Sequence, residues 1–358
     1  MSIQTTVKPT KRINYKNWLL ALWTVPEFQE GEWVDPVTKW LMVTRASVLS
    51  MTVISGLLGG LLAAVAGKFD LGLTLLTTLG ITLAHAGSNL VNDYWDARHG
   101  WDDLPDSPRA NYGPQGFVHG DFSRRTLITA IVIILALASL IGLYLTLVAG
   151  WPVALFAVAG AAVLLLYSGD PFPLKYRGLG EIAVLIVWGP LMVGGTYYIL
   201  ARELPLWVII ASLPYALGVM TVLLGKHLDK YDFDRTHGIR TLVVIIGEKN
   251  ARKLTQWCMV LMYVSALALL VMGFWMPKSM TVFGLFMPSV VLVLLAIPSL
   301  RQIWPIFNLP KPKEKPAYDP IWPLYFVGLA FVHNRNFGGL YLVGILLDIA
   351  LRAFVFKA

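Results

Sequence analysis

Residues 71–96 read LGLTLLTTLGITLAHAGSNLVNDYWD, an apolar stretch that ends in amides and carboxylates. No Asp, Glu, Lys or Arg precedes Asp93, so the stretch can cross about 30 Å of hydrocarbon as a helix rising about 1.5 Å per residue. On that helix Asn89, Asp93 and Asp96 fall at i, i+4 and i+7 and share one face. Charged groups at membrane depth are costly and mostly functional. We therefore expect a membrane helix whose polar end carries a site.

The composition extends this interpretation to the whole chain. Of 358 residues, 56% are hydrophobic and 14% are charged, and the mean hydropathy is +0.64. Apolar runs near twenty residues long predict an all-α, polytopic membrane protein with about nine transmembrane helices. We further expect these helices to form a bundle around a lipid-accessible pocket capped by cytoplasmic loops. We expect an N-terminal arm over 1–40 and a transmembrane domain over 41–358. The expected spans are residues 43–66, 71–95, 124–148, 150–168, 181–200, 206–228, 250–275, 279–300 and 338–356.

The basic residues predict the orientation. If the N-terminus, the segments 97–123, 169–180, 229–249 and 301–337 and the residues flanking them share one side, all but five of the 29 Lys and Arg lie there. The exceptions are Lys68, Arg202, Lys278, Arg352 and Lys357. The positive-inside bias places that side in the cytoplasm, so we expect a multi-pass protein of the cell inner membrane. This topology and anionic partners account for the net charge of +8, and no nucleic-acid partner is expected.

Two segments outside the main spans leave alternatives open. Residues 14–41 carry tryptophans at 18, 23, 33 and 40, which is typical of a segment lying in the membrane interface, although a disordered arm is the alternative. Six prolines make 305–323 a loop. The apolar residues 324–334 behind it form either a surface helix or the start of a long final span.

A second acidic cluster ends the span 206–228. It contains Asp229, Asp232 and Asp234, interleaved with the basic residues Lys226, Lys230, Arg235 and Arg240. By itself the alternation is also typical of a solvated helix with ion pairs. Both clusters, however, end spans of the same orientation and can face one pocket, where crowded carboxylates require a cation between them. Hard oxygen ligands favour Mg²⁺, and we expect the ion to bind together with a diphosphate.

The first cluster continues past its helix. Gly100 offers a helix stop, after which Asp102, Asp103 and Asp106 can fold back over the acidic face. A solvated Asp-rich loop is the alternative for these three residues.

The motif from Asn89 to Asp96 resembles the first aspartate-rich motif of the UbiA superfamily of intramembrane prenyltransferases. Residues 167–181, YSGDPFPLKYRGLGE, resemble the loop between spans four and five in the naphthoate-prenylating, menaquinone branch. Residues 234–242, DRTHGIRTL, are similar to the end of the second motif. The resemblance covers nearly the whole chain apart from the N-terminal arm.

The resemblance implies roles for particular residues. The implied metal ligands, including candidates taken from the two clusters, are Asn92, Asp93, Asp96, Asp102, Asp229, Asp232 and Asp234. The implied catalytic residues are Asp93, Asp96, Lys175 and Asp234. The substrate-binding candidates are Arg45, Asn89, Asn92, Lys175, Lys226, Lys230 and Arg240. Arg45 has a plain alternative as an interface arginine that extends toward water.

The chain departs from the family pattern at two positions. Lys230 stands where the second motif usually begins with an acidic residue, and Gly100 replaces an aspartate that many relatives carry. The second departure matches the menaquinone branch. For the first, we hypothesise that the Lys230 ammonium sits directly against diphosphate and supplies part of one metal's charge.

The expected function is Mg²⁺-dependent transfer of a polyprenyl chain from its diphosphate to an aromatic acceptor. The resemblance implies that this acceptor is 1,4-dihydroxy-2-naphthoate, in menaquinone synthesis. Another quinone precursor, chlorophyll, haem or a phosphosugar remains an alternative acceptor. A transporter and a non-catalytic lipid-binding subunit are alternative classes, and complex partners stay open. Aromatic faces that could stabilise an allylic cation belong to Tyr94, Trp95, Trp188, Tyr197 and Tyr198. No general base stands out, although His227 and His237 lie near the second cluster and His85 lies in the span of the first.

Overall fold

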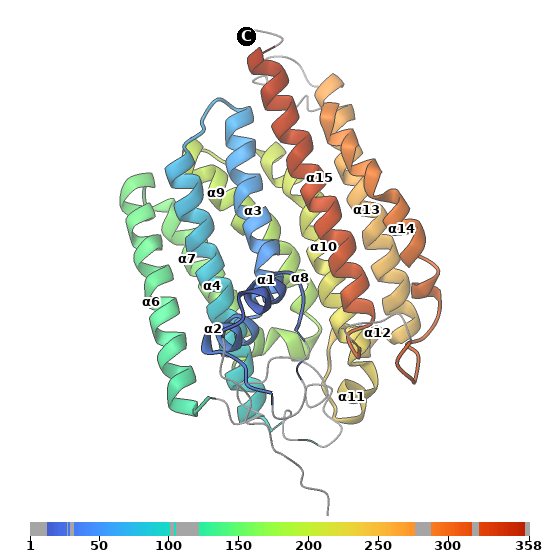
Figure 1. Cartoon of the computed structure of the whole chain (residues 1–358). Helices are drawn as coiled ribbons and strands as arrows, with labels where there is room; N and C mark the ends of the chain where they lie inside the picture. Colours follow the sequence, from blue (N-terminus) through green and yellow to red (C-terminus); the bar gives the residue numbers. More distant parts are fainter. Residues whose placement is uncertain are drawn as a thin grey trace, which may run out of the picture.

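The protein is a helical bundle in the computed structural model (Figure 1), which describes residues 13–26, 28, 32–100, 104, 122–275, 288–316 and 322–354. Regular secondary structure within these residues is entirely helical, which confirms the all-α prediction. The helices are α1 (Tyr15–Trp23), α2 (Pro36–Val43), α3 (Ala46–Val65), α4 (Leu71–Arg98), α6 (Arg124–Ala149), α7 (Pro152–Ser168), η1 (Leu174–Arg177), α8 (Gly180–Ile186), η2 (Val187–Leu191), α9 (Met192–Ala201), α10 (Leu206–Asp229), α11 (Tyr231–Thr236), α12 (Leu242–Ile246), α13 (Glu248–Trp275), η3 (Pro288–Ala296), α14 (Ile297–Ile303), η4 (Ile306–Asn308) and α15 (Phe326–Phe354).

The lengths of these helices fit a multi-pass membrane protein. Among the described residues, six helices are long and apolar enough to cross a membrane: Ala46–Val65, Leu71–Arg98, Arg124–Ala149, Gly180–Ala201, Leu206–Asp229 and Glu248–Met272. Pro152–Ser168 and Pro288–Ile303 are shorter apolar helices. The count of nine spans stays a prediction. The last helix, α15, begins at Phe326, so residues 324–334 lead into a long final helix instead of forming a separate surface helix.

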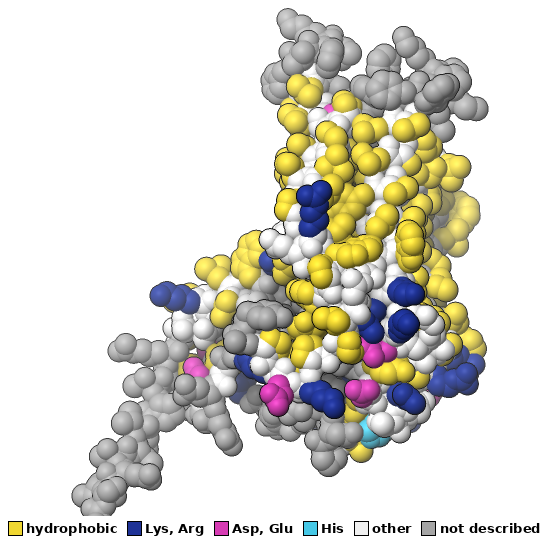
Figure 2. Space-filling view, turned by 90° about the vertical axis from the view of Figure 1, so that its right-hand side faces the viewer, with side chains coloured by type: hydrophobic (Ala, Val, Ile, Leu, Met, Phe, Trp, Pro, Cys, Tyr) yellow, Lys and Arg dark blue, Asp and Glu magenta, His cyan; other side chains and the backbone are white. Residues whose placement is uncertain are grey.

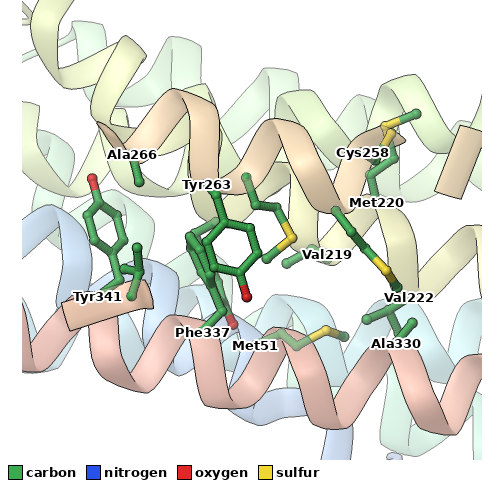
Figure 3. Close-up of a cluster of buried hydrophobic side chains, with 14 of the residues drawn as sticks. Met51, Val219, Met220, Val222, Cys258, Tyr263, Ala266, Ala330, Phe337 and Tyr341 are labelled. Atoms are coloured by element: carbon green, nitrogen blue, oxygen red, sulfur yellow. The ribbon is translucent and has the colours of Figure 1, made fainter. Parts of the chain in front are cut away.

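Helices at the centre of the bundle are buried, whereas a helix at its edge has mostly exposed side chains. In α10, 72% of the apolar window is buried, whereas in α6 the share is 6%. Figure 3 shows the core where α10, α13 and α15 meet, with Tyr263, Phe337 and Tyr341 among its side chains. Gly338 permits the close approach of α15 to α10, since a Cβ there would lie 2.3 Å from the Tyr215 ring. Because lipid tails are as apolar as leucine, the hydrophobic effect does not drive membrane helices together. Tight packing of this kind stabilises their association instead.

The surface divides along the bundle axis. On the face shown in Figure 2, hydrophobic side chains cover the upper part, and most of the Lys, Arg, Asp and Glu side chains gather at the lower end. The short helices α1, α2, α11 and α12 lie at this lower end in Figure 1. We call it the polar end of the bundle. The distribution of basic residues in the sequence predicts that this end faces the cytoplasm.

The N-terminal arm folds into α1 and α2. Asp35 caps α2 by accepting hydrogen bonds from the N–H groups of Val37 and Thr38, and its Oδ1 also accepts one from Trp18 Nε1 of α1 at 2.9 Å. Burial acts to raise the pKa of Asp35, but these hydrogen bonds outweigh it and lower that pKa below its ordinary value. One carboxylate therefore ties the two short helices together, while Leu19, Trp23 and other apolar side chains of α1 stay exposed.

The acidic end of α4 follows the sequence prediction. The helix runs to Arg98, and Gly100 has a φ of 72°, a left-handed conformation that glycine adopts readily. The predicted helix stop at Gly100 is confirmed. Asp102, Asp103 and Asp106 lie outside the described residues.

Candidate active site

A cavity of about 760 Å³ occupies the bundle between α3, α4, α6, α7, α9 and α10. Its polar lining brings together residues from both acidic clusters and from the loop between α7 and α8: Arg45, Asn89, Asn92, Asp96, Lys175, Lys226 and Lys230. Most of the remaining wall is apolar, with Leu135, Leu164 and Ile199 among its side chains. The cavity therefore combines a cationic, amide-rich region with a long apolar one.

Asp96 is the centre of the polar region. It is 4% exposed, and its carboxylate accepts hydrogen bonds from Lys175 Nζ at 3.0 and 3.2 Å, Tyr176 Oη at 2.7 Å and Asn92 Nδ2 at 3.1 Å. The oxygen of the Asn92 amide, Oδ1, accepts a hydrogen bond from Ser168 Oγ at 2.7 Å. Lys175 is itself buried, and a buried lysine requires such a partner. The helical face of α4 is thus fixed against the end of α7 and against η1.

Arg45 neutralises the other carboxylate of the first cluster. Its guanidinium is ion-paired and hydrogen-bonded with Asp93, and it donates to Asn89 Oδ1 at 3.4 Å. Arg45 adopts a left-handed φ of 56° where the chain passes from α2 into α3, an uncommon conformation for a residue other than glycine. The Asn89 amide in turn donates to the carbonyl of Thr44 at 3.0 Å. These contacts aim Arg45 into the cavity and do not leave it as a free interface arginine.

The second cluster reaches the cavity through its lysines. Lys226 and Lys230 line the wall, and Lys230 Nζ lies 3.7 Å from Asp234 Oδ1. Asp234 is 1% exposed, and that Oδ1 atom has no hydrogen-bond partner among the described residues. The second cluster therefore contributes two lysines to the cavity lining, whereas its carboxylates, Asp229, Asp232 and Asp234, are not part of that lining.

Asp229 has a different place from the one that the sequence pattern implied. Its carboxylate accepts hydrogen bonds from the N–H groups of Phe326 and Val327, both at 2.9 Å, and lies 3.7 Å from Lys311 Nζ. It caps the N-terminus of α15, where a negative charge is favourable. Because both of its carboxylate oxygens already accept hydrogen bonds in this cap, and because it does not line the cavity, we remove Asp229 from the set of metal ligands.

Other predicted residues also lie away from the cavity. Asp232 and Arg240 are exposed and do not line its wall. Of the aromatic candidates, Trp188 lines the cavity, whereas Tyr94, Trp95, Tyr197 and Tyr198 do not. Asp102 lies outside the described residues.

Neither of the two histidines near the second cluster lines the cavity. His227 is 1% exposed, and its Nδ1 lies 2.7 Å from Glu181 Oε1. His237 Nδ1 lies 2.9 Å from the carbonyl of Phe233. These contacts join α10 to α8 and close the turn of α11, so both histidines act in the scaffold.

Three contributors were not singled out from the sequence. Tyr176 and Ser168 bond the first cluster directly, and Tyr167 lines the cavity. All three belong to the motif of residues 167–181 quoted above, and Tyr176 directly follows Lys175. The hydroxyl groups within that motif were the signal that could have found them.

Comparison with known proteins identifies this arrangement. The model of the UbiA prenyltransferase family matches residues 52–318. The chain belongs to the UbiA prenyltransferase family. It is a prenyltransferase and a multi-pass membrane protein, and this answers the choice between enzyme, transporter and non-catalytic subunit.

Relatives named 1,4-dihydroxy-2-naphthoate octaprenyltransferase are similar to this UbiA-family chain. The protein of Bacillus subtilis is 27% identical over 67% of this chain and 76% of its own length. The protein of Escherichia coli is 34% identical over 60% of this chain and 70% of its own length.

Solved structures share the fold. An apo UbiA homolog from Aeropyrum pernix K1 has a TM-score of 0.59 at 18% identity, covering 84% of this chain and 98% of that one. A UbiA homolog from Archaeoglobus fulgidus bound to GPP and Mg²⁺ has a TM-score of 0.52 at 17% identity, covering 87% of this chain and 99% of that one. At such identities the likeness establishes the fold.

The donor atoms of this UbiA-family cavity fit a magnesium ion shared with substrate. In the described part of the chain, no group of three or more His, Cys, Asp or Glu could hold a metal alone. Mg²⁺, however, keeps several waters and usually takes one or two carboxylates together with phosphate oxygens. Asn92 and Asp96 supply hard oxygens at the cavity wall. This donor set suits an ion that arrives with a diphosphate.

Proposed function

We propose that this UbiA-family enzyme transfers a polyprenyl chain from a prenyl diphosphate to 1,4-dihydroxy-2-naphthoate, with Mg²⁺, at the cytoplasmic face of the inner membrane. The observation that carries the proposal is the single cavity in which four cationic side chains and the amides of α4 adjoin a long apolar wall. The names of the relatives support the naphthoate acceptor. The basic character of the polar end supports the cytoplasmic orientation.

The cationic region suits a diphosphate leaving group. Arg45, Lys175, Lys226 and Lys230 line it, and fixed cations oppose the negative charge that builds on a diphosphate as its C–O bond breaks. Arginine offers a planar fork of donors, and lysine acts as a point charge. A magnesium ion held by Asn92, Asp93, Asp96 and Asp234 would add Lewis-acid stabilisation of the same charge.

The apolar region suits the prenyl chain and the reacting carbon. Wall residues such as Leu135, Leu164 and Leu191 offer no hydrogen bonds to water, so water is poorly held there. Exclusion of water protects an allylic cation from hydrolysis and leaves the acceptor ring as its partner. The indole of Trp188 is an aromatic face within this wall.

The experiment incubates purified full-length protein in detergent with Mg²⁺, radiolabelled polyprenyl diphosphate and a panel of acceptors. We expect labelled lipid with 1,4-dihydroxy-2-naphthoate and stoichiometric release of pyrophosphate. Asp93→Ala and Asp96→Ala should lose this activity by at least about a hundredfold, as removal of groups that stabilise transition-state charge does. Asp70→Asn is the matched control, because Asp70 caps the opposite end of α4 and asparagine preserves a cap. Transfer only to another acceptor would disprove the naphthoate assignment, and no transfer at all would disprove the proposal.

A further inference from the structure

A histidine deep in the cavity has no part in the contacts described so far. His85 lies on α4, four residues before Asn89, and therefore about 6 Å further along the same helical face. Both residues line the cavity, and His85 is 8% exposed. It marks the place where the cationic region gives way to the apolar wall.

One edge of the His85 ring is held by α3. Its Nδ1 lies 2.7 Å from Thr52 Oγ1, and Thr52 is fully buried and is not part of the cavity lining. The other ring nitrogen, Nε2, makes no hydrogen bond to the described residues. Nε2 is not among the fully buried unpartnered atoms of the described residues and is accessible from the cavity, where a bound molecule can supply its hydrogen-bond partner.

A second aromatic ring stands against the histidine. The Trp188 indole meets the His85 ring edge to face, with centroids 4.9 Å apart and an interplanar angle of 87°. Trp188 lies in η2, a π-helical turn, and its carbonyl accepts a hydrogen bond from Ser55 Oγ at 3.0 Å. Such turns often occur at functional sites. The two rings, packed at nearly a right angle, offer aromatic surfaces against which another aromatic ring can pack.

The hydrogen-bonding chemistry of His85 Nε2 limits which chemical groups could be its partner. If Nδ1–H donates to Thr52, Nε2 is an acceptor, and in the other tautomer Nε2–H is a donor. A hydroxyl group suits both cases because it can donate and accept. Arg45 and Lys175, which would bind the diphosphate, pair with Asp93 and Asp96, nearer the polar end of α4 than His85, so we assign the hydroxyl to the second substrate.

We propose that His85 is the residue that recognises a ring hydroxyl of the aromatic acceptor, and that Thr52 and Trp188 hold it in position. The proposal rests on the proposed prenyl transfer and names the acceptor's contact within it. His85 then governs where the acceptor ring lies relative to the cleaved C–O bond. It does not govern how tightly the diphosphate binds.

The test compares KM values for the two substrates in wild type, His85→Phe and His85→Gln. Loss of one neutral hydrogen bond should raise the acceptor KM about tenfold in His85→Phe, while the diphosphate KM stays within about twofold. His85→Gln, which keeps one polar group, should fall between. His333→Phe is the matched control, because His333 is a fully buried histidine of α15 that does not line the cavity. Its acceptor KM should equal that of wild type.

Acceptor analogues can distinguish recognition of a ring hydroxyl by His85 from a role of its side chain in packing alone. Acceptors with each hydroxyl blocked in turn as a methyl ether are assayed with the same proteins. Wild type should discriminate against one ether about tenfold, and His85→Phe should lose that discrimination. Equal rises in both KM values, or discrimination that persists in His85→Phe, would overturn the proposal. If His85→Phe does not fold, Thr52→Val against Thr52→Ser gives the same comparison. A wild type that transfers to no acceptor would overturn the proposed function first.

Discussion

At the scale of single residues, the two carboxylates of the first cluster that the structure describes each face a cation that the chain itself supplies. Arg45 pairs with Asp93, and Lys175 pairs with Asp96. The mutual repulsion that the sequence implied is therefore relieved inside the protein. The same cations line the cavity, where a diphosphate would meet them. Ion pairs that are buried in this way cost stability when one partner is removed.

Lys175→Met tests the buried pair. The variant leaves Asp96 charged and buried without its cation, so we expect the free energy of unfolding to fall by about 3–5 kcal/mol. The double variant Lys175→Met/Asp96→Asn should recover much of this loss, because no unpaired charge remains. Thermal unfolding of the purified proteins in one detergent measures both. A single variant as stable as wild type would contradict the pairing.

Lys230 offers a second prediction at this scale. It lines the cavity, and its Nζ lies 3.7 Å from Asp234 Oδ1. If its ammonium supplies charge that a metal supplies elsewhere, Lys230→Asp should change the Mg²⁺ concentration that gives half-maximal transfer and make the dependence steeper. Lys249→Asp, at an exposed site on α13, is the control. Superimposable Mg²⁺ titrations of wild type and Lys230→Asp would reject this role.

At the scale of helices, the acidic clusters differ in what they hold together. The face of α4 holds η1 and α7 through Asp96 and Asn92. The end of α10 holds the start of α15 through Asp229. A close approach at Gly225 supports this second junction, since a Cβ there would lie 2.9 Å from the backbone of Phe326. The second cluster thus combines a structural cap with a cationic wall.

Asp229→Ala separates the cap from a metal ligand. We expect it to lower the free energy of unfolding by at least about 0.5–2 kcal/mol, the usual range for a lost helix cap. Asp229→Ser should restore part of this loss, because serine also caps helices. Mg²⁺ titrations of the transfer activity should match wild type in both variants. A metal requirement that rises in Asp229→Ala alone would return this residue to the metal site.

At the scale of the whole molecule, the charge distribution predicts how the bundle sits in the membrane. Lys68 lies between α3 and α4 and Thr236 ends α11, and both are exposed. In a Cys258→Ser background, an impermeant maleimide should label Lys68→Cys from outside intact cells and should not label Thr236→Cys. Inverted vesicles should show the opposite pattern. Labelling of Thr236→Cys in intact cells would reverse the proposed orientation.

The sequence predicted the helical bundle because long apolar runs have one stable form in lipid. It also predicted the polar face of α4, since Asn89, Asp93 and Asp96 are spaced by the helical period. It did not predict the cap at Asp229, because the partner N–H groups lie 97 and 98 residues away and meet it only through tertiary packing. The pairing of Lys175 with Asp96 likewise depends on how η1 packs against α4.

The central claim is that the cationic region between α4 and α10 holds the diphosphate of a prenyl donor. It is tested most directly by an experimental structure of the full-length enzyme with a non-hydrolysable prenyl diphosphate and Mn²⁺, whose anomalous scattering locates the metal. We predict phosphate density among Arg45, Lys175, Lys226 and Lys230, with the metal beside Asp96. Phosphate and metal bound outside this cavity would contradict the account.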